Sequence, residues 1–100
     1  MGTRLQLDQE LRKIVPNVYF QPPESLKMRY PCILYERSTG VSQHADNLVY
    51  RHTTEYQLTY ITKDPDDAVV DILLHSFEMI RHDRFFVVDN LNHDVYTLFY

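Results

Sequence analysis

Apolar positions recur at helical spacing over the first fifteen residues of the chain. They form one stripe, while the charged side chains of this segment lie off it. Thr3 and Gln6 have the spacing of a capping box, and Pro16 cannot continue a helix. We therefore expect an amphipathic helix that starts after Thr3 and ends before Pro16. Its apolar stripe is Leu7, Leu11, Ile14 and Val15.

Strand-type segments follow. Val18–Phe20 is a short β-rich run closed by two prolines, residues 24–29 are polar and irregular, and Pro31 precedes a second strand at Cys32–Arg37. From Leu48 onward, apolar or aromatic residues alternate with polar ones. This alternation is the clearest periodic signal in the sequence, and it predicts a long antiparallel strand with one apolar-aromatic side and one polar side.

The second half of the chain begins with an acidic, proline-containing segment. We expect Asp64 to cap a second helix, with Pro65 at its first position, and the helix to run to Met79 or Ile80. Two further strands are expected at 84–88 and 94–99, joined by a hairpin loop over 89–93.

The predicted element order is α-β-β-β-α-β-β. The sequence has no internal repeat, low-complexity stretch or linker, so residues 1–100 are interpreted as a single domain. Runs of strands interrupted by one helix favour the α+β class over a regular βαβ alternation. We expect a mixed, mainly antiparallel sheet with both helices packed on one face.

Composition narrows the function classes. Apolar residues make up 44% and charged residues 24%, which is typical of a soluble globular domain. The net charge of -4 argues against a general nucleic-acid binder. No apolar run has the length of a signal peptide or a membrane span, so we expect synthesis in a reducing, cytosol-like compartment. Cys32 is the only cysteine, which excludes an intrachain disulfide, and its apolar neighbours predict a buried thiol.

Candidate chemistry is sparse. None of the five histidines has the spacing of a helical metal pair, although His82-Asp83 and His93-Asp94 could meet across the last hairpin. Two glycines are too few for a phosphate-binding loop, and no serine lies in a nucleophile elbow. Asp66 and Asp67 are paired carboxylates, but their place at the expected helix start explains them without a catalytic role. We therefore expect no catalytic residue, no cofactor, no metal ligand and no enzymatic activity.

The tyrosines raise the alternative of an RNA-binding sheet. An RNA-recognition sheet needs aromatic residues interleaved with Lys or Arg on its open face. In the long strand, however, the aromatic residues share their side with Leu48 and Leu58. This pattern favours packing beneath helices.

Several short motifs resemble a known family. They are NVYFQPP at 17–23, YPCILY at 30–35, ADN at 45–47, TKDP at 62–65 and DNLNHD at 89–94. With the preceding helix, they resemble the small tail-completion, or tail-terminator, proteins encoded among the head-tail joining genes of long-tailed bacteriophages. The resemblance spans nearly the whole chain and consists of packing and turn motifs. Neighbouring head-tail joining and tail-tube families have similar sizes and layouts, so they stay open as alternatives.

The resemblance implies a structural role. Subunits of that family form a ring, typically a hexamer, that caps the head-proximal end of the tail tube, stops tube growth and joins the head connector. The implied partners are other copies of the chain, the tail-tube protein and the connector or stopper protein. Viral DNA would pass through the channel without sequence-specific binding. A net negative charge on the subunits around the ring is compatible with that passage. The implied location is the virion tail, after assembly in the host cytoplasm and without membrane contact.

Interface candidates lie where packing does not explain the residues. Lys27 and Arg29, in segment 24–29, could pair with an acidic neighbour, and Tyr100 ends a strand that could be a sheet edge. The polar loop 38–47 supplies the other candidates, which are Thr39, Gln43, His44 and Asp46. The alternative to an interface, for both segments, is a loop that contacts only solvent. Two hypotheses outside the class of virion proteins stay open. The first is a small RNA-binding or regulatory α+β domain, and the last is a metal-dependent enzyme.

Overall fold

The computed structural model describes residues 3–38 and 54–100. Helix α1 spans Arg4–Ile14 and begins with the expected capping box. The Thr3 hydroxyl accepts a hydrogen bond from the Gln6 backbone N–H at 3.2 Å, and the Gln6 side chain accepts one from the Thr3 N–H at 2.9 Å. Leu7 and Leu11, from the predicted stripe, are fully buried. The prediction for the first helix is therefore confirmed.

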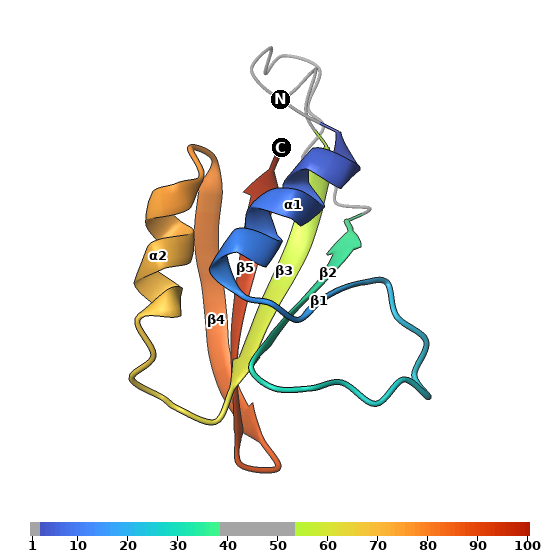
Figure 1. Ribbon diagram of the computed structural model, residues 1–100. Coiled ribbons are helices and arrows are strands. Elements are labelled where there is room, and N and C mark those ends of the chain that lie inside the picture. The colour runs from blue at the N-terminus through green and yellow to red at the C-terminus, as the bar shows by residue number, and fades with distance from the viewer. Residues whose placement is uncertain (1–2, 39–53) are drawn as a thin grey trace.

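Five strands form one mixed sheet in the order β1-β2-β3-β5-β4. They are β1 Val18–Phe20, β2 Cys32–Arg37, β3 Glu55–Thr62, β4 Ile80–Val88 and β5 Leu91–Phe99. Strands β1 and β2 are parallel, and the other neighbours are antiparallel. Both α1 and α2 (Val69–Ser76) lie on the same face of this sheet (Figure 1). The expected α+β class, mainly antiparallel sheet and element order are confirmed.

The core lies between the helices and the sheet. In β3 the alternation is as expected, with Tyr56, Leu58 and Tyr60 buried and the intervening residues partly exposed. The aromatic side chains of β3 thus pack beneath the helices, as the sequence predicted. The start of the predicted long strand, before residue 54, lies outside the described residues. The remaining fully buried members of the core are Ile33, Tyr35, Leu73, Tyr96 and Leu98.

The opposite face of the sheet is covered in part by the segment between β1 and β2. The Tyr19 hydroxyl accepts a hydrogen bond from the Arg29 backbone N–H at 3.1 Å, which ties this segment to the sheet. Cys32 and Ile61, paired across β2 and β3, are buried on this face. The expectation of a buried thiol is therefore confirmed, and burial raises the pKa of the Cys32 thiol to about 11.

The predicted start of the second helix is wrong. Helix α2 begins at Val69, after Ala68, and no side chain caps it. The aspartates instead form local turns: Asp64 accepts a hydrogen bond from the Asp66 N–H, and Asp67 accepts one from the Val69 N–H, each at 2.9 Å. Asp commonly bonds to the backbone two residues further on, which competes with a helix start.

The predicted end of this helix is also wrong. Helix α2 stops at Ser76 because Phe77 is extended, with φ -132° and ψ 146°. Strand β4 then starts at Ile80, which pairs with Leu98, so the segment expected to end the helix enters the sheet. Strand pairing overrides the helical spacing here.

The final hairpin is tighter than predicted. Val88 pairs with Leu91, so only Asp89 and Asn90 form the turn, not residues 89–93. Their φ values are 53° and 62°. Such mirror-image turns match the twist of the strands, and Asp and Asn tolerate the left-handed region better than most residues. Both strands are longer than expected as a result, and Figure 1 shows the hairpin extending beyond the helices.

Candidate interaction surface

Strand β4 lies at one edge of the sheet, beside β5, with no other described strand on its outer side. Its second half is apolar and exposed: Phe85 is 50%, Phe86 36%, Val87 54% and Val88 48% exposed. We call these four residues the β4 apolar end. Sheet edges usually carry charges, prolines or a cover that prevents pairing, whereas contiguous exposed apolar residues mark interaction sites.

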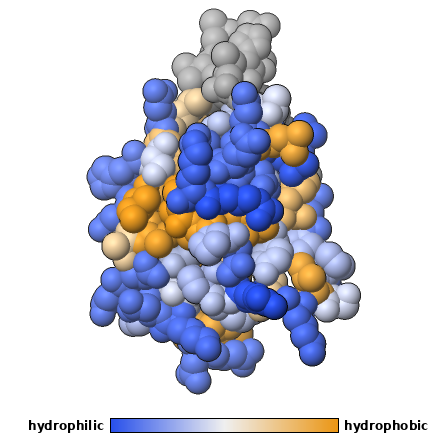
Figure 2. All heavy atoms as spheres, viewed as in Figure 1, coloured by the Kyte–Doolittle hydropathy of each residue, from blue (hydrophilic) through white to orange (hydrophobic). Residues whose placement is uncertain are grey.

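The β4 apolar end presents side chains on both faces of the sheet. Phe85 is opposite Asp94, on the helix side, whereas Phe86 is opposite His93, on the other face. An irregularity at Asp83 shifts the register between His82 and Arg84, so the facing pattern changes along the strand. Figure 2 shows apolar residues on the helix side, beside α2 and at the hairpin end, surrounded by hydrophilic residues.

The face away from the helices carries an aromatic and basic group. The ring of Phe86 stacks on His93, with centroids 4.7 Å apart and planes at 14°. The guanidinium of Arg84 lies 5.5 Å from the centre of the Phe86 ring. This arrangement orients Phe86 and keeps a cation beside it.

The two His-Asp pairs meet across the hairpin through only one member of each. His82 Nε2 lies 2.9 Å from Asp94 Oδ1, but His93 stacks on Phe86 instead. Asp83 contacts Arg81 and Thr97 on the far face of the sheet. Within residues 3–38 and 54–100, no group of three or more His, Cys, Asp and Glu residues could hold a metal ion.

Beside Phe85, a shallow groove of about 440 Å³ runs along the segment that precedes α2. One of its carboxylates, Asp67, accepts a hydrogen bond from the Tyr60 hydroxyl at 2.6 Å. Partial burial opposes ionisation of Asp67, but the hydrogen bonds from Tyr60, Val69 and Thr62 outweigh it and hold its pKa below the ordinary 3.8. The groove is lined by Pro65, Asp66, Asp67, Val70, Asp71, Phe85 and Asp94.

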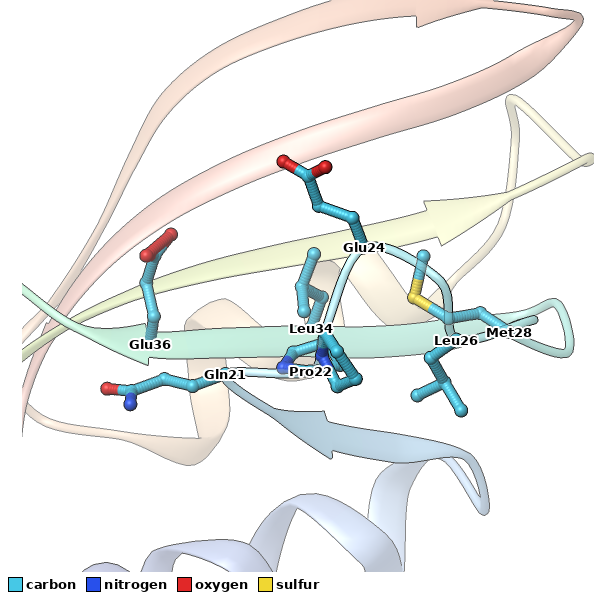
Figure 3. Close-up of a pocket in the computed structure, with 8 residues that line it drawn as sticks. Gln21, Pro22, Glu24, Leu26, Met28, Leu34 and Glu36 are labelled. Carbon is cyan, nitrogen blue, oxygen red and sulfur yellow. The ribbon is translucent and has the colours of Figure 1, made fainter.

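A second pocket lies towards the other edge of the sheet, beneath residues 21–29. Its volume is about 250 Å³. In Figure 3, Leu34 rises from β2 under the loop, and the carboxylates of Glu24 and Glu36 point to the same side of the opening. We call it the loop pocket, and its lining is Gln21, Pro22, Pro23, Glu24, Leu26, Met28, Leu34 and Glu36.

The structure describes three of the predicted interface residues. Lys27 and Arg29 are exposed on the irregular segment that forms the loop pocket, as expected from the sequence. Tyr100 packs edge-on against Phe77, with ring centroids 6.0 Å apart, and its backbone pairs with Thr54. The idea that the C-terminal strand is an edge is wrong, because β5 lies between β3 and β4. Thr39, Gln43, His44 and Asp46 lie outside the described residues.

Sequence reasoning missed the edge position of β4. The run from Phe85 to Val88 was interpreted only as a strand, and a continuous apolar run is typical of a strand buried on both faces. The sheet order places it at the edge instead. No local pattern in the sequence distinguishes an exposed edge from a buried strand here, because the order of strands in the sheet determines whether the run is covered.

Among the described residues, no helix is long and apolar enough to cross a membrane. No protein-family model, curated protein or solved structure matches the chain.

Proposed function

We propose that this protein is a structural subunit of a long-tailed bacteriophage virion, a tail terminator that acts through binding and not through catalysis. Copies would form a ring at the head-proximal end of the tail tube, and the resemblance implies a hexamer. The ring would stop tube growth, join the head connector or stopper protein, and let viral DNA pass through its channel.

The observation that supports this proposal best is the β4 apolar end. Four consecutive apolar residues are exposed on a sheet edge that no other described strand covers. A surface of this kind costs solubility unless a partner covers it. A ring subunit has such a partner on each side, because head-to-tail contacts close into a ring when the rotation between copies permits.

The motif resemblance supplies the virion context. Within the fold, NVYFQPP spans β1 and the start of the loop pocket, and YPCILY contains most of β2. These motifs therefore belong to the parallel strand pair and the loop pocket beside it. Another head-tail joining or tube-associated protein of the same virion would share these features, so it remains the alternative within this class.

Two measurements test the proposal. Light scattering across a concentration series, together with negative-stain images, should reveal a closed ring of about six copies. In a phage that lacks the gene, tails of uncontrolled length or unjoined heads and tails should appear, and a plasmid copy should restore normal particles. A protein that stays monomeric at high concentration and whose loss leaves tails unchanged contradicts the proposal.

One observation favours a second candidate function, RNA binding by the sheet face away from the helices. Phe86 on this face has Arg84 and His93 beside its ring, the combination of aromatic and basic groups that stacks single-stranded bases. Binding of single-stranded RNA that weakens steeply with salt and is lost in Phe86→Ala would support this candidate. Absence of RNA binding at low salt would exclude this second candidate, and the virion proposal would be the one that stands.

A further inference from the structure

The β4 apolar end and the loop pocket lie towards opposite edges of one sheet. Strand β4 is the last strand in the order β1-β2-β3-β5-β4, and the loop pocket is built on β2 and the segment that follows β1. Figure 1 shows β4 on the left of the sheet and the loop that follows β1 on the right. One copy therefore cannot bring the two surfaces together, but two copies can.

The edge beside the loop pocket offers little backbone for strand pairing. The Val18 carbonyl, on the outer side of β1, accepts a hydrogen bond from the Arg12 guanidinium at 3.1 Å. With a strand of only three residues and this side-chain cap, β1 offers little to another strand. A partner at this side would therefore bind through side chains, and the loop pocket is the hollow that is available there.

The size and lining of the loop pocket suit one apolar side chain. Its volume of about 250 Å³ is below the roughly 300–1,000 Å³ of small-molecule pockets. Leu34 and the loop prolines give it an apolar floor, while Glu24 and Glu36 give its rim negative charge (Figure 3). A complementary partner presents an apolar side chain with a cation next to it.

The β4 apolar end has this combination. Phe86 points to the face away from the helices, where Leu34 and Glu36 of β2 also point. The Arg84 cation lies beside the Phe86 ring and is exposed. The β4 apolar end and the loop pocket therefore match in apolar character and in charge. Each copy has one of each surface.

We propose that the β4 apolar end of one copy binds the loop pocket of the next, with Phe86 entering the pocket and Arg84 near Glu24 and Glu36. The contact is head-to-tail, so each copy uses both surfaces, and repetition gives a closed ring or an open chain. This inference rests on the proposed function, because it names the contact that would form the ring.

Charge reversal tests the contact without touching the core, because Arg84, Glu24 and Glu36 are all exposed. Arg84→Glu alone, and Glu24→Lys with Glu36→Lys, should each raise the concentration needed for assembly by about tenfold or more through like-charge repulsion. An equal mixture of the two proteins should assemble like the original, because alternating copies restore opposite charges at every contact. Unchanged melting temperatures serve as the folding control.

Disulfide trapping tests directly whether the two surfaces of neighbouring copies are in contact. A protein with both Leu26→Cys and Val88→Cys should give a ladder of linked copies on mild oxidation, because the two thiols lie on the two partner surfaces. Each single variant should give dimers at most. The matched control, Leu5→Cys with Leu26→Cys, places the second thiol on the exposed face of α1 and should give no ladder. The natural thiol, Cys32, is buried and does not interfere.

The outcomes separate this inference from the proposed function. A ladder in the double variant, with rescue on mixing the charge variants, supports the contact. An oligomer that forms without a ladder and ignores the charge reversals overturns the contact but leaves the ring. A monomer at every concentration, with no ladder, overturns both.

Discussion

Tyr60 and Asp67 join β3 to the segment that precedes α2. The Tyr60 hydroxyl donates a hydrogen bond of 2.6 Å to Asp67 Oδ2, and the other carboxylate oxygen accepts one from the Val69 N–H. A residue expected to belong to a helix start thus connects the sheet to the beginning of α2. Burial and the Asp67 hydrogen bond raise the pKa of the Tyr60 phenol, so it is a donor at any physiological pH.

We expect Tyr60→Phe to destabilise the fold by about 2 kcal/mol at neutral pH, since a hydrogen bond to a charged group is lost. The pKa of Asp67 is lowered from 3.8 in the folded state, so its contribution is complete above about pH 4 and disappears as pH falls through the folded pKa. Urea unfolding of both proteins at neutral pH and at a series of decreasing pH values below 3.8 measures this difference. A destabilisation that does not decrease anywhere in this series would contradict the assignment.

Tyr96 provides the contrasting case. It is fully buried, and its hydroxyl has no hydrogen-bond partner among the described residues. An unsatisfied buried hydroxyl costs about 1–3 kcal/mol, so Tyr96→Phe should leave stability unchanged or raise it by about 1 kcal/mol. Urea unfolding alongside Tyr60→Phe, the same chemical change at a satisfied hydroxyl, gives the matched comparison. A clear loss of stability in Tyr96→Phe would mean that the hydroxyl is satisfied in solution.

Two leucines on α1 test which face of the helix forms the core. Leu11 is fully buried, whereas Leu5 is 64% exposed. Leu11→Ala should cost about 2–5 kcal/mol because it leaves a cavity, and Leu5→Ala should change stability by less than about 0.5 kcal/mol. Both lie on the same helix, so helix propensity cancels between them. Equal effects in denaturant unfolding would disprove this orientation of α1.

The tight turn at the hairpin end predicts which residues position 90 tolerates. Asn90 has a φ of 62° and an exposed side chain. Asn90→Val should destabilise the hairpin by about 1–2 kcal/mol because a β-branched residue is strained in the left-handed region. Asn90→Gly should be at least as stable as the original, because Asp-Gly is a preferred mirror-image turn. Thermal unfolding of the three proteins checks this order, and a stable Val variant would exclude the assigned turn.

Elements with strong local signals were predictable from the sequence. The capping box at Thr3 and the apolar stripe gave the limits of α1 to within a residue, because those signals act within one turn of helix. Alternation in β3 gave its buried side for the same reason, since side chains of a strand alternate between faces.

Elements whose limits depend on distant partners were not predictable in this way. The segment at Asp64 has the composition of a helix start, but the Asp67 side chain bonds to Tyr60, seven positions earlier in the chain. The candidate surface was missed for a similar reason. The sequence shows that Phe85 to Val88 form a strand, and only the order of strands determines whether that strand is covered.

By itself, the sequence determined the α+β class, the order of the elements and the buried side of β3, because these follow from spacing along the chain. The tertiary structure decided that β4 and not β5 is an edge, that the hairpin turns on Asp89 and Asn90, and that the loop pocket lies across the sheet from the β4 apolar end. These features depend on which strands pair, and pairing between distant segments is set by packing over the whole domain, which no local pattern contains.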